Sequence, residues 1–318
     1  MDWLKSLYPL VRDIISRESP DYWPGLRDVL YGLAGEPMIP EAILPLASCK
    51  AVNGEAKEAV YISAAIVAAA TCLRIFDDVE DKDRPGKLWC DVGPARAWNY
   101  ASAMQILSFN ILSKAPLTPE VFHKVNRCFI DTFLHITCGQ ERDLSGNTRT
   151  IKDYWLTIEW KIACGYATAC AVGAMVGTIN AELIQACRSF GHHLGIAIQI
   201  LNDMQSIWCS DGITDLKQGK VTLPLLYGLS IDHPERDELN FLMTTSEVST
   251  HGERIKDILD HLDTRSFLIW AALMERDQAI KAISICPNPD GREALEAYIT
   301  GIFGEMDLLL PQNSLAVP

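Results

Sequence analysis

A long uncharged segment that runs into a cluster of acids is the feature of this sequence that most restricts its fold. Residues 59–73, AVYISAAIVAAATCL, carry no charged side chain. Because such a helix is poor in charge on every face, we expect it to lie in the centre of a protein, surrounded by other helices. The segment is shorter than the about 18–20 apolar residues that span a membrane, so the sequence does not predict a membrane-spanning protein.

The remainder of the chain also has the periodicity of helices. Apolar residues recur at three- and four-residue spacing, and no alternating β-branched segment lies between turn signals. We therefore predict an all-α fold in a single domain over residues 1–318. The motifs described below fall within residues 25–230, and we expect a loose C-terminal tail over residues 308–318.

Charge and cysteine usage limit the partners and the compartment. The formal net charge of -13 would repel the phosphates of a nucleic acid, so no nucleic-acid partner is expected. The ten cysteines include no CxxC pair, and the N-terminus has no secretory pattern. These features predict reduced, mostly buried thiols in a cytoplasmic protein.

The acidic cluster DDVED, residues 77–81, is the first candidate site. Asp77 and Asp81 are four residues apart and share one helix face, and Asp78 flanks them. Three carboxylates at the C-terminal end of a helix repel one another and oppose the helix dipole. Mg²⁺ prefers such oxygen ligands, shared with substrate phosphates, so a magnesium site is one interpretation and a solvated helix end is the other.

A second polar edge follows a long apolar helix, at NDMQS, residues 202–206. Asn202, Asp203 and Ser206 stand at i, i+1 and i+4, again along one helix edge. A basic loop with Lys217 and Lys220 comes next. Two oxygen-bearing helix edges together with lysines favour a site for magnesium and a diphosphate, in which lysines neutralise the charge that the metal leaves.

With these motifs the chain resembles the trans-isoprenyl diphosphate synthases, also called polyprenyl synthetases. DDVED is similar to the family's first aspartate-rich motif, and GQERDL at 139–144 is similar to its GQxxDL motif. Trp160-Lys161 begins the segment usually found as KT, and DLKQGKVTLPLLYGL at 215–229 is similar to the DLxxGKxTLP signature. The resemblance implies an isoprenoid synthase fold, with antiparallel helices around a deep central cavity, and a homodimer.

The resemblance also implies roles for individual residues. Asp77, Asp78 and Asp81 match Mg²⁺ ligands, and Asn202, Asp203 and Ser206 occupy the second metal motif. The other matches are expected to bind the substrate: Arg84, Lys161 and Lys220 as groups that hold an allylic prenyl diphosphate, Gln199 as the glutamine before the second motif, and Leu73 and Cys72 as the cavity floor. Since Leu73 and Cys72 are of medium and small size, we expect a C15 or C20 diphosphate. Asp77, Asp78, Asp81, Lys161 and Lys220 are the expected catalytic set.

The sequence departs from the family at the site for the acceptor, isopentenyl diphosphate. Where chain-elongating members have GGKRxRP this chain has AGEPMIP, so the basic positions fall on Glu36, Pro37 and Ile39. The family's RRG is Arg84-Pro85-Gly86 here. A diphosphate site that has lost its cations and gained an acid should repel that acceptor.

The second motif departs as well. Asn202 and Ser206 resemble the NDxxSxxxE pattern of class I terpene cyclases, whose final acid would fall on Ser210, with Asp211 one residue later. We therefore favour a magnesium-dependent terpene synthase that ionises an allylic diphosphate and cyclises or quenches the cation without isopentenyl diphosphate. One alternative is a prenyltransferase with another acceptor, such as an indole or a tryptophan. Another is a non-catalytic partner subunit of a prenyl diphosphate synthase.

Overall fold

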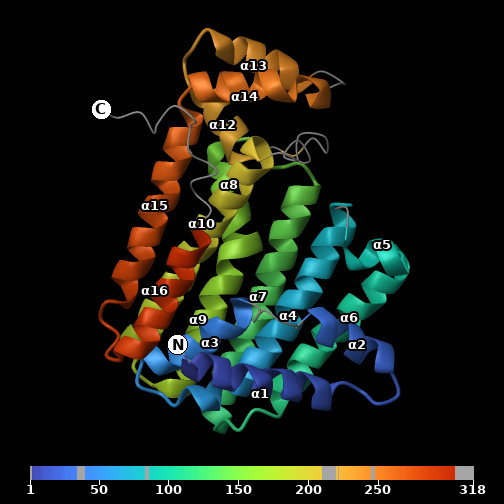
Figure 1. Ribbon diagram of the computed structural model, residues 1–318, viewed down its shortest axis with the longest axis vertical. Helices are drawn as coiled ribbons and strands as arrows, with labels where there is room; N and C mark the ends of the chain where they lie inside the picture. Colours follow the sequence, from blue (N-terminus) through green and yellow to red (C-terminus); the bar gives the residue numbers. More distant parts are fainter. Residues whose placement is uncertain are drawn as a thin grey trace. The chain divides into compact units, whose positions relative to one another are not determined.

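The computed structural model describes residues 2–33, 40–82, 86–209, 220, 222–244 and 248–304. Within these ranges every regular element is a helix and none is a strand (Figure 1). The prediction of an all-α fold is therefore confirmed for the described part of the chain. The predicted tail, residues 308–318, lies outside it.

The helices gather into two compact units, and each unit combines three separate stretches of the sequence. Unit 1 comprises residues 1–134, 165–191 and 281–298. Unit 2 comprises residues 135–164, 192–280 and 299–318. Both units are therefore assembled from sequence that is far apart in the chain. The single domain over residues 1–318 stays a prediction.

Unit 1 contains the N-terminal helices and two later segments, residues 165–191 and 281–298. Its N-terminal elements are α1 (Asp2–Glu18), α2 (Pro24–Leu33), α3 (Pro40–Ala51), the 3-10 turn η1 (Ala56–Ala59), α4 (Val60–Glu80), α5 (Leu88–Val92), α6 (Pro94–Ser113) and the first part of α7 (Pro119–Leu144). The later segments belong to α9 (Cys164–Gly177), α10 (Ala181–Trp208), α15 (Thr264–Ile283) and α16 (Pro289–Ile302).

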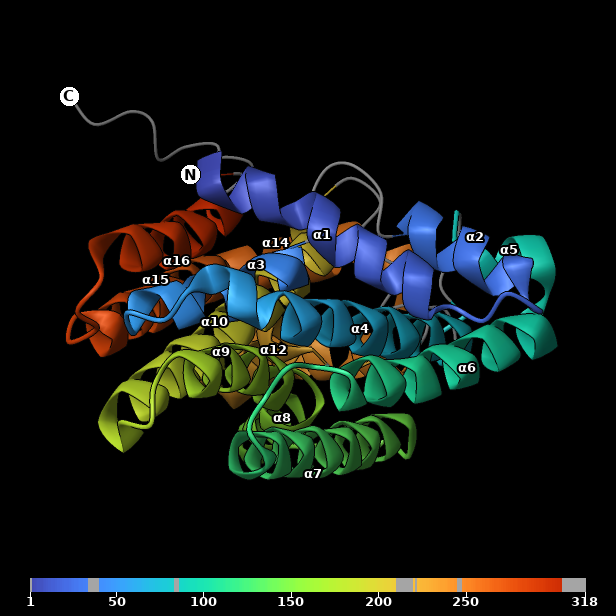
Figure 2. The ribbon, with the colours of Figure 1, turned by 90° about the horizontal axis from the view of Figure 1, so that it is seen from below.

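The central helix of unit 1 is α4, which contains most of the uncharged segment. α1, α3 and α6 pack against it, and Figure 2 shows α1, α4 and α6 side by side. The Ser63 hydroxyl, which is fully buried, donates to the Ala42 carbonyl of α3 at 2.8 Å. Among the described residues, the stretch Ala56–Glu80 is long and apolar enough to cross a membrane, but 67% of its most apolar part is buried inside the fold. This burial fits the core helix expected from the sequence.

Unit 2 begins with the last turns of α7. It continues through α8 (Ile151–Ile158), the π-helix η2 (Glu159–Ala163), the second half of α10, α12 (Leu223–Ser230), α13 (Glu235–Thr244), η3 (Val248–His251), α14 (Gly252–His261) and most of α15. α8 starts with a capping box, in which Thr150 accepts from the Asp153 N–H and the Asp153 carboxylate accepts from the Thr150 N–H. Such a box satisfies two N–H groups that have no partner in the first turn of a helix.

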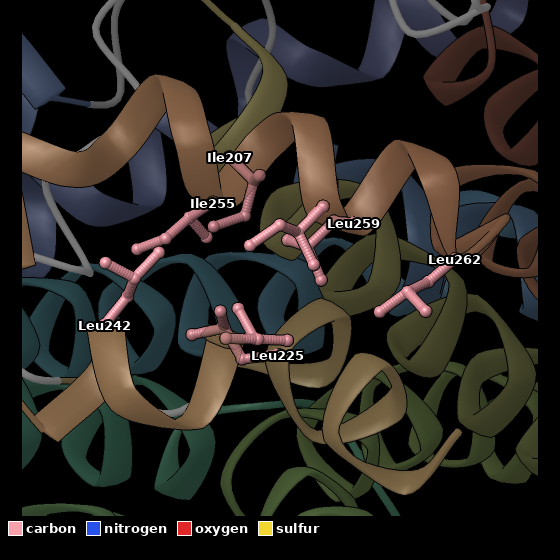
Figure 3. Close-up of a cluster of buried hydrophobic side chains, with 8 residues drawn as sticks. Ile207, Leu225, Leu242, Ile255, Leu259 and Leu262 are labelled. Carbon is pink, nitrogen blue, oxygen red and sulfur yellow. The ribbon is translucent and has the colours of Figure 1, made fainter. Parts of the chain in front are cut away.

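Four helices of unit 2 share an apolar core. Figure 3 shows side chains from α10, α12, α13 and α14 that point toward one another, and Leu225, Ile255 and Leu259 are each 0% exposed. Burial of a leucine or isoleucine side chain contributes about 1.5–3 kcal/mol to stability. This core fixes the C-terminal end of α10 and the start of α12, the two elements that flank the basic loop.

Candidate functional site

The acidic cluster lies where α4 ends. Asp77 and Asp78 are in the last turn, and the N–H of Asp81, the C-cap residue, donates to the Asp77 carbonyl at 2.8 Å. The next residue, Lys82, has a φ of 56°, and a residue in this left-handed region commonly terminates a helix. The positive charge of Lys82 is also favourable beside the negative end of the helix dipole.

The carboxylates at this helix end have basic neighbours. Lys87 Nζ lies 2.7 Å from Asp78 Oδ1, in an ion pair within unit 1. One turn before Asp77, the guanidinium of Arg74 lies 2.6 Å from the Glu41 carboxylate of α3. Lys87 thus partly offsets the acidic charge of this end of α4, whereas the charge of Arg74 is balanced by Glu41.

The donor chemistry of the acidic cluster fits a magnesium ion, because carboxylate oxygens are the hard ligands that Mg²⁺ prefers. Asp78 and Asp81 are each only 8% exposed, and a buried carboxylate requires a compensating charge or hydrogen-bond donors. Among the described residues, no three His, Cys, Asp or Glu side chains are grouped so that they could hold a metal by themselves. Mg²⁺ often combines one or two carboxylates with waters and substrate phosphates, so the cluster suits an ion bound together with a phosphate-bearing substrate.

The predicted cavity floor lies one turn before the acids. Cys72 is fully buried and Leu73 is half-buried. Burial raises the pKa of the Cys72 thiol to about 12, so this side chain stays protonated and serves as a small apolar group.

Lys161 lies in the π-helix η2 of unit 2, and two residues of the GQERDL motif determine its position. Its Nζ lies 2.8 Å from Asp143 Oδ2, and both side chains are partly buried. A Cβ atom on Gly139 would lie 2.5 Å from the Lys161 backbone nitrogen, closer than real Cβ contacts occur. Gly139 therefore permits the close approach of α7 to η2, and π-helical turns are frequent at functional sites.

The three residues of the second motif differ in burial: Asp203 is buried, whereas Asn202 and Ser206 are at least partly exposed. Asn202 is exposed, and Ser206 is half-buried with its hydroxyl donating to the Asp203 carbonyl at 2.9 Å. Asp203 is only 3% exposed, and its carboxylate accepts from the Tyr154 hydroxyl at 2.8 Å, the Gln199 amide at 2.6 Å and the Leu223 N–H at 2.9 Å. The Gln199 amide nitrogen, predicted to bind substrate, is thus directed at Asp203.

Tyr154 remains a hydrogen-bond donor because its environment disfavours ionisation. Burial, with the nearby Asp203 carboxylate, raises the pKa of Tyr154 well above its ordinary value. A protonated phenol donates to a carboxylate at any physiological pH.

Lys220 is half-buried and stands three residues before Leu223, the first residue of α12. Several other predicted positions lie outside the described residues. They are Arg84, the acceptor-site positions Glu36, Pro37, Ile39 and Pro85, the loop residue Lys217, and the two candidates for a final acid, Ser210 and Asp211.

Sequence reasoning did not assign three residues that contact the predicted site. Asp143 belongs to GQERDL, but the motif alone does not say that its carboxylate pairs with Lys161. Tyr154 stands seven residues before Lys161, a spacing that places both near one face of a helix. Lys87 follows the acidic cluster in a segment rich in charge, and only the fold shows that it pairs with Asp78.

Comparison with known proteins gives a consistent result. The sequence pattern of the polyprenyl synthetase family matches residues 42–262. A geranylgeranyl diphosphate synthase of Mycobacterium tuberculosis is 30% identical over 255 residues, which cover 74% of this chain and 72% of that enzyme. A short chain isoprenyl diphosphate synthase of Methanothermobacter thermautotrophicus is 25% identical over 90% of this chain and 91% of its own length. The tryptophan prenyltransferase ComQ of Bacillus spizizenii is 25% identical over 178 residues, 56% of this chain and 61% of ComQ.

Solved structures share the fold. A decaprenyl diphosphate synthase from Rhodobacter capsulatus superposes with a TM-score of 0.84 at 20% identity, over 95% of this chain and 96% of that one. A polyprenyl synthase from Caulobacter crescentus, in complex with calcium and isoprenyl diphosphate, gives a TM-score of 0.80 at 20% identity over 94% of both chains. The predicted isoprenoid synthase fold is confirmed by these similarities.

Proposed function

Because this chain belongs to the polyprenyl synthetase family, we propose that it releases diphosphate from an allylic prenyl diphosphate, with Mg²⁺, and does not use isopentenyl diphosphate as acceptor. The proposal rests on a difference between two sets of residues in the sequence, those for the allylic diphosphate and those for the acceptor. The acids at 77, 78 and 81 and the lysines at 161 and 220 are present, whereas the acceptor positions hold Glu36, Pro37, Ile39 and Pro85. A chain with these residues can bind one diphosphate but lacks the cations for a second.

Asp77, Asp78 and Asp81 would hold magnesium at α4, and Asn202 and Ser206 would hold it at α10. When bound, the metal supplies positive charge that stabilises the departing diphosphate. The burial of Asp78 and Asp81 supports this assignment, because electrostatic attraction is stronger where water is excluded.

The lysines of unit 2 would bind the diphosphate and stabilise it as it leaves. Asp143 keeps the Lys161 ammonium in a fixed position, 2.8 Å away, which reduces the entropy lost when the ligand binds. Lys220 would add a second positive charge, and Arg84 a third. Each such charge-assisted bond is stronger than a neutral hydrogen bond.

After the diphosphate leaves, the allylic cation would be cyclised or quenched, as in a terpene synthase. The small, protonated Cys72 and the half-buried Leu73 support a substrate of C15 or C20. Stabilisation of a carbocation needs apolar and aromatic surroundings that exclude water.

A prenyltransferase with another acceptor is the second candidate. The similarity to ComQ, which is named a tryptophan prenyltransferase, favours an indole or tryptophan acceptor. The segment DKDRPGKLW, residues 81–89, also resembles bacterial relatives that modify aromatic acceptors. A third possibility, a non-catalytic partner of a prenyl diphosphate synthase, gives no reason for retaining the acids and the lysines together.

The compartment and the assembly belong to the same proposal. The ten cysteines form no disulfide in the described structure, and several are buried; this supports the proposal of a reducing cytoplasm. We propose a homodimer on the ground of the family resemblance alone.

The test is to incubate the protein with Mg²⁺ and C10, C15 or C20 allylic diphosphates, alone, with isopentenyl diphosphate, or with an indole. Release of pyrophosphate with a terpene hydrocarbon or alcohol in the first arm supports the terpene synthase. Dependence on the indole supports the second candidate, and a longer prenyl diphosphate made only with isopentenyl diphosphate would refute the proposal.

Asp77→Asn is the matched control for this assay. The substitution keeps the size of the side chain and removes the charge that holds the metal, so pyrophosphate release should fall by about a hundredfold or more while the fold is retained. Unchanged release by this variant, with an unchanged dependence on Mg²⁺, would remove the acidic cluster from the site.

A further inference from the structure

The carboxylate of Asp203 is buried, and both of its oxygens accept hydrogen bonds from protein donors. It is 3% exposed and accepts three hydrogen bonds of 2.6–2.9 Å from Gln199, Tyr154 and the Leu223 N–H. Oδ2 accepts two of these bonds and Oδ1 accepts the third. Such donors stabilise a buried carboxylate, and here they come from the protein itself.

The three donors come from three different elements of unit 2, and each element leads to a predicted site group. Tyr154 lies in α8, which continues directly into η2 with Lys161. Gln199 lies in α10, one turn before Asn202. Leu223 begins α12, three residues after Lys220.

Hydrogen bonds to one carboxylate therefore fix the relative positions of these three elements. The two lysines are separated by 59 positions in the sequence, from 161 to 220. Asp203 connects the segments that carry the two lysines, because it binds Tyr154 of α8, which leads to Lys161, and the N–H of Leu223, which follows Lys220. Small displacements of charged groups matter, because a misplacement of about 1 Å can lower a rate a hundredfold.

From this geometry we infer that Asp203 is a positioning residue, which sets the places of Lys161 and Lys220 for the diphosphate and is not itself a magnesium ligand. The inference rests on the proposed function for the identity of the ligand. It replaces the metal role that the sequence pattern suggested for this residue, and it leaves Asn202 and Ser206 as the polar groups that α10 would offer to the metal.

The test compares Asp203→Asn, Asp203→Ala and Tyr154→Phe. Asparagine can keep all three hydrogen bonds, because its oxygen accepts from Tyr154 and Leu223 and the Gln199 amide can rotate to accept from its nitrogen. Alanine removes every one of the bonds, and Tyr154→Phe removes only one, which provides a variant that folds if the alanine variant does not. Tyr100→Phe, which removes a buried hydroxyl from α6 in unit 1, is the matched control.

Two measurements are needed. Calorimetric titration with pyrophosphate and Mg²⁺ should show affinity reduced about tenfold in Asp203→Ala and Tyr154→Phe, and within about threefold of wild type in Asp203→Asn and Tyr100→Phe. The Mg²⁺ concentration for half-saturation should rise in Asp77→Asn and stay unchanged in Asp203→Asn. A rise in Asp203→Asn equal to that in Asp77→Asn would overturn the inference, because it would identify Asp203 as a ligand.

Hydrogen exchange gives a result that does not depend on any ligand. Amides of residues 154–163 and 223–226 should exchange faster in Asp203→Ala and Tyr154→Phe, and at the wild-type rate in Asp203→Asn. Unchanged exchange in all variants would contradict the positioning role even if the protein bound no pyrophosphate. Failure of wild type to bind pyrophosphate, with exchange altered as expected, would instead count against the proposed function.

Discussion

The replacement of Gly139 by alanine tests whether the close approach of α7 to η2 positions Lys161. The added Cβ would lie 2.5 Å from the Lys161 nitrogen, 2.8 Å from its Cα and 2.9 Å from the Trp160 carbonyl carbon. All three atoms belong to the backbone, so no side-chain rotation can relieve the contact. Because Cβ atoms are essentially never found below 3.0 Å, the two segments must separate by at least 3.0 − 2.5 = 0.5 Å.

A displacement of 0.5 Å is large compared with the tolerance of the Lys161 ion pair. A rigid shift of that size along the bond would lengthen the present 2.8 Å between Nζ and Asp143 Oδ2 to as much as 3.3 Å, which is beyond the usual range for such bonds. Overpacking of this kind costs about 1–3 kcal/mol of unfolding free energy. The better helix propensity of alanine offsets up to about 1 kcal/mol of that cost. We therefore expect a net loss of stability and a reduction in turnover by about ten- to a hundredfold.

Gly301→Ala is the matched control, since Gly301 is helical and no atom lies within 4 Å of the Cβ that it would gain. That variant should be unchanged or stabilised by up to about 1 kcal/mol. Urea unfolding of both variants isolates the cost of the contact, and pyrophosphate release measures its functional effect. If Gly139→Ala were as stable and as active as Gly301→Ala, the close approach would have no role in placing Lys161.

Two further predictions concern pH and thiol chemistry. Burial raises the pKa of Glu18, but hydrogen bonds and charge from Lys114 and Arg17 outweigh it and lower that pKa below its ordinary value. The stabilisation by Glu18 is therefore present above the unfolded pKa of about 4.3 and is lost as pH falls through the folded value. Glu18→Gln should lose less unfolding free energy than wild type between pH 5 and pH 3 in urea titrations, and an equal loss would contradict the assignment. Burial raises the pKa of Cys49, Cys72 and Cys170 to about 12, whereas Cys90 and Cys138 are exposed. Iodoacetamide at pH 8 should thus modify Cys90 and Cys138 first by mass spectrometry, and early modification of Cys72 would show that its burial is wrong.

The helices of the fold could be predicted because each helix leaves a pattern in its own short stretch of sequence. The uncharged segment 59–73 predicted a buried helix, and α4 is that helix. The π-helix at Glu159–Ala163 could not be predicted, because it is a single turn of five residues, EWKIA, too short to show a periodicity different from that of an α-helix. The division into two units depends on contacts between distant segments, which have no signature in short windows of sequence.

The candidate site could be predicted in its residue types but not in its contacts. Spacing of three and four residues placed Asn202, Asp203 and Ser206 on one helix edge, and the structure separates them by burial, with Asn202 exposed and Asp203 buried. That separation depends on Tyr154 and Leu223, which are 49 and 20 positions from Asp203. A pattern within one helix contains no information on partners from other helices.

The discontinuous composition of the two units has a consequence for synthesis of the protein on the ribosome. Unit 1 needs residues 281–298 to be complete, so its first 134 residues leave the ribosome long before their last partners do. Domains fold as the chain emerges, at about 5–20 residues per second, and exposed apolar surface in such intermediates favours aggregation. The end of α3, where the Ala51 carbonyl accepts from the Asn288 N–H at 3.0 Å, therefore lacks this partner for many seconds in each round of translation. A chaperone that binds nascent chains should be recruited in that interval, and a chain truncated before residue 281 should be degraded rather than accumulate as a folded fragment.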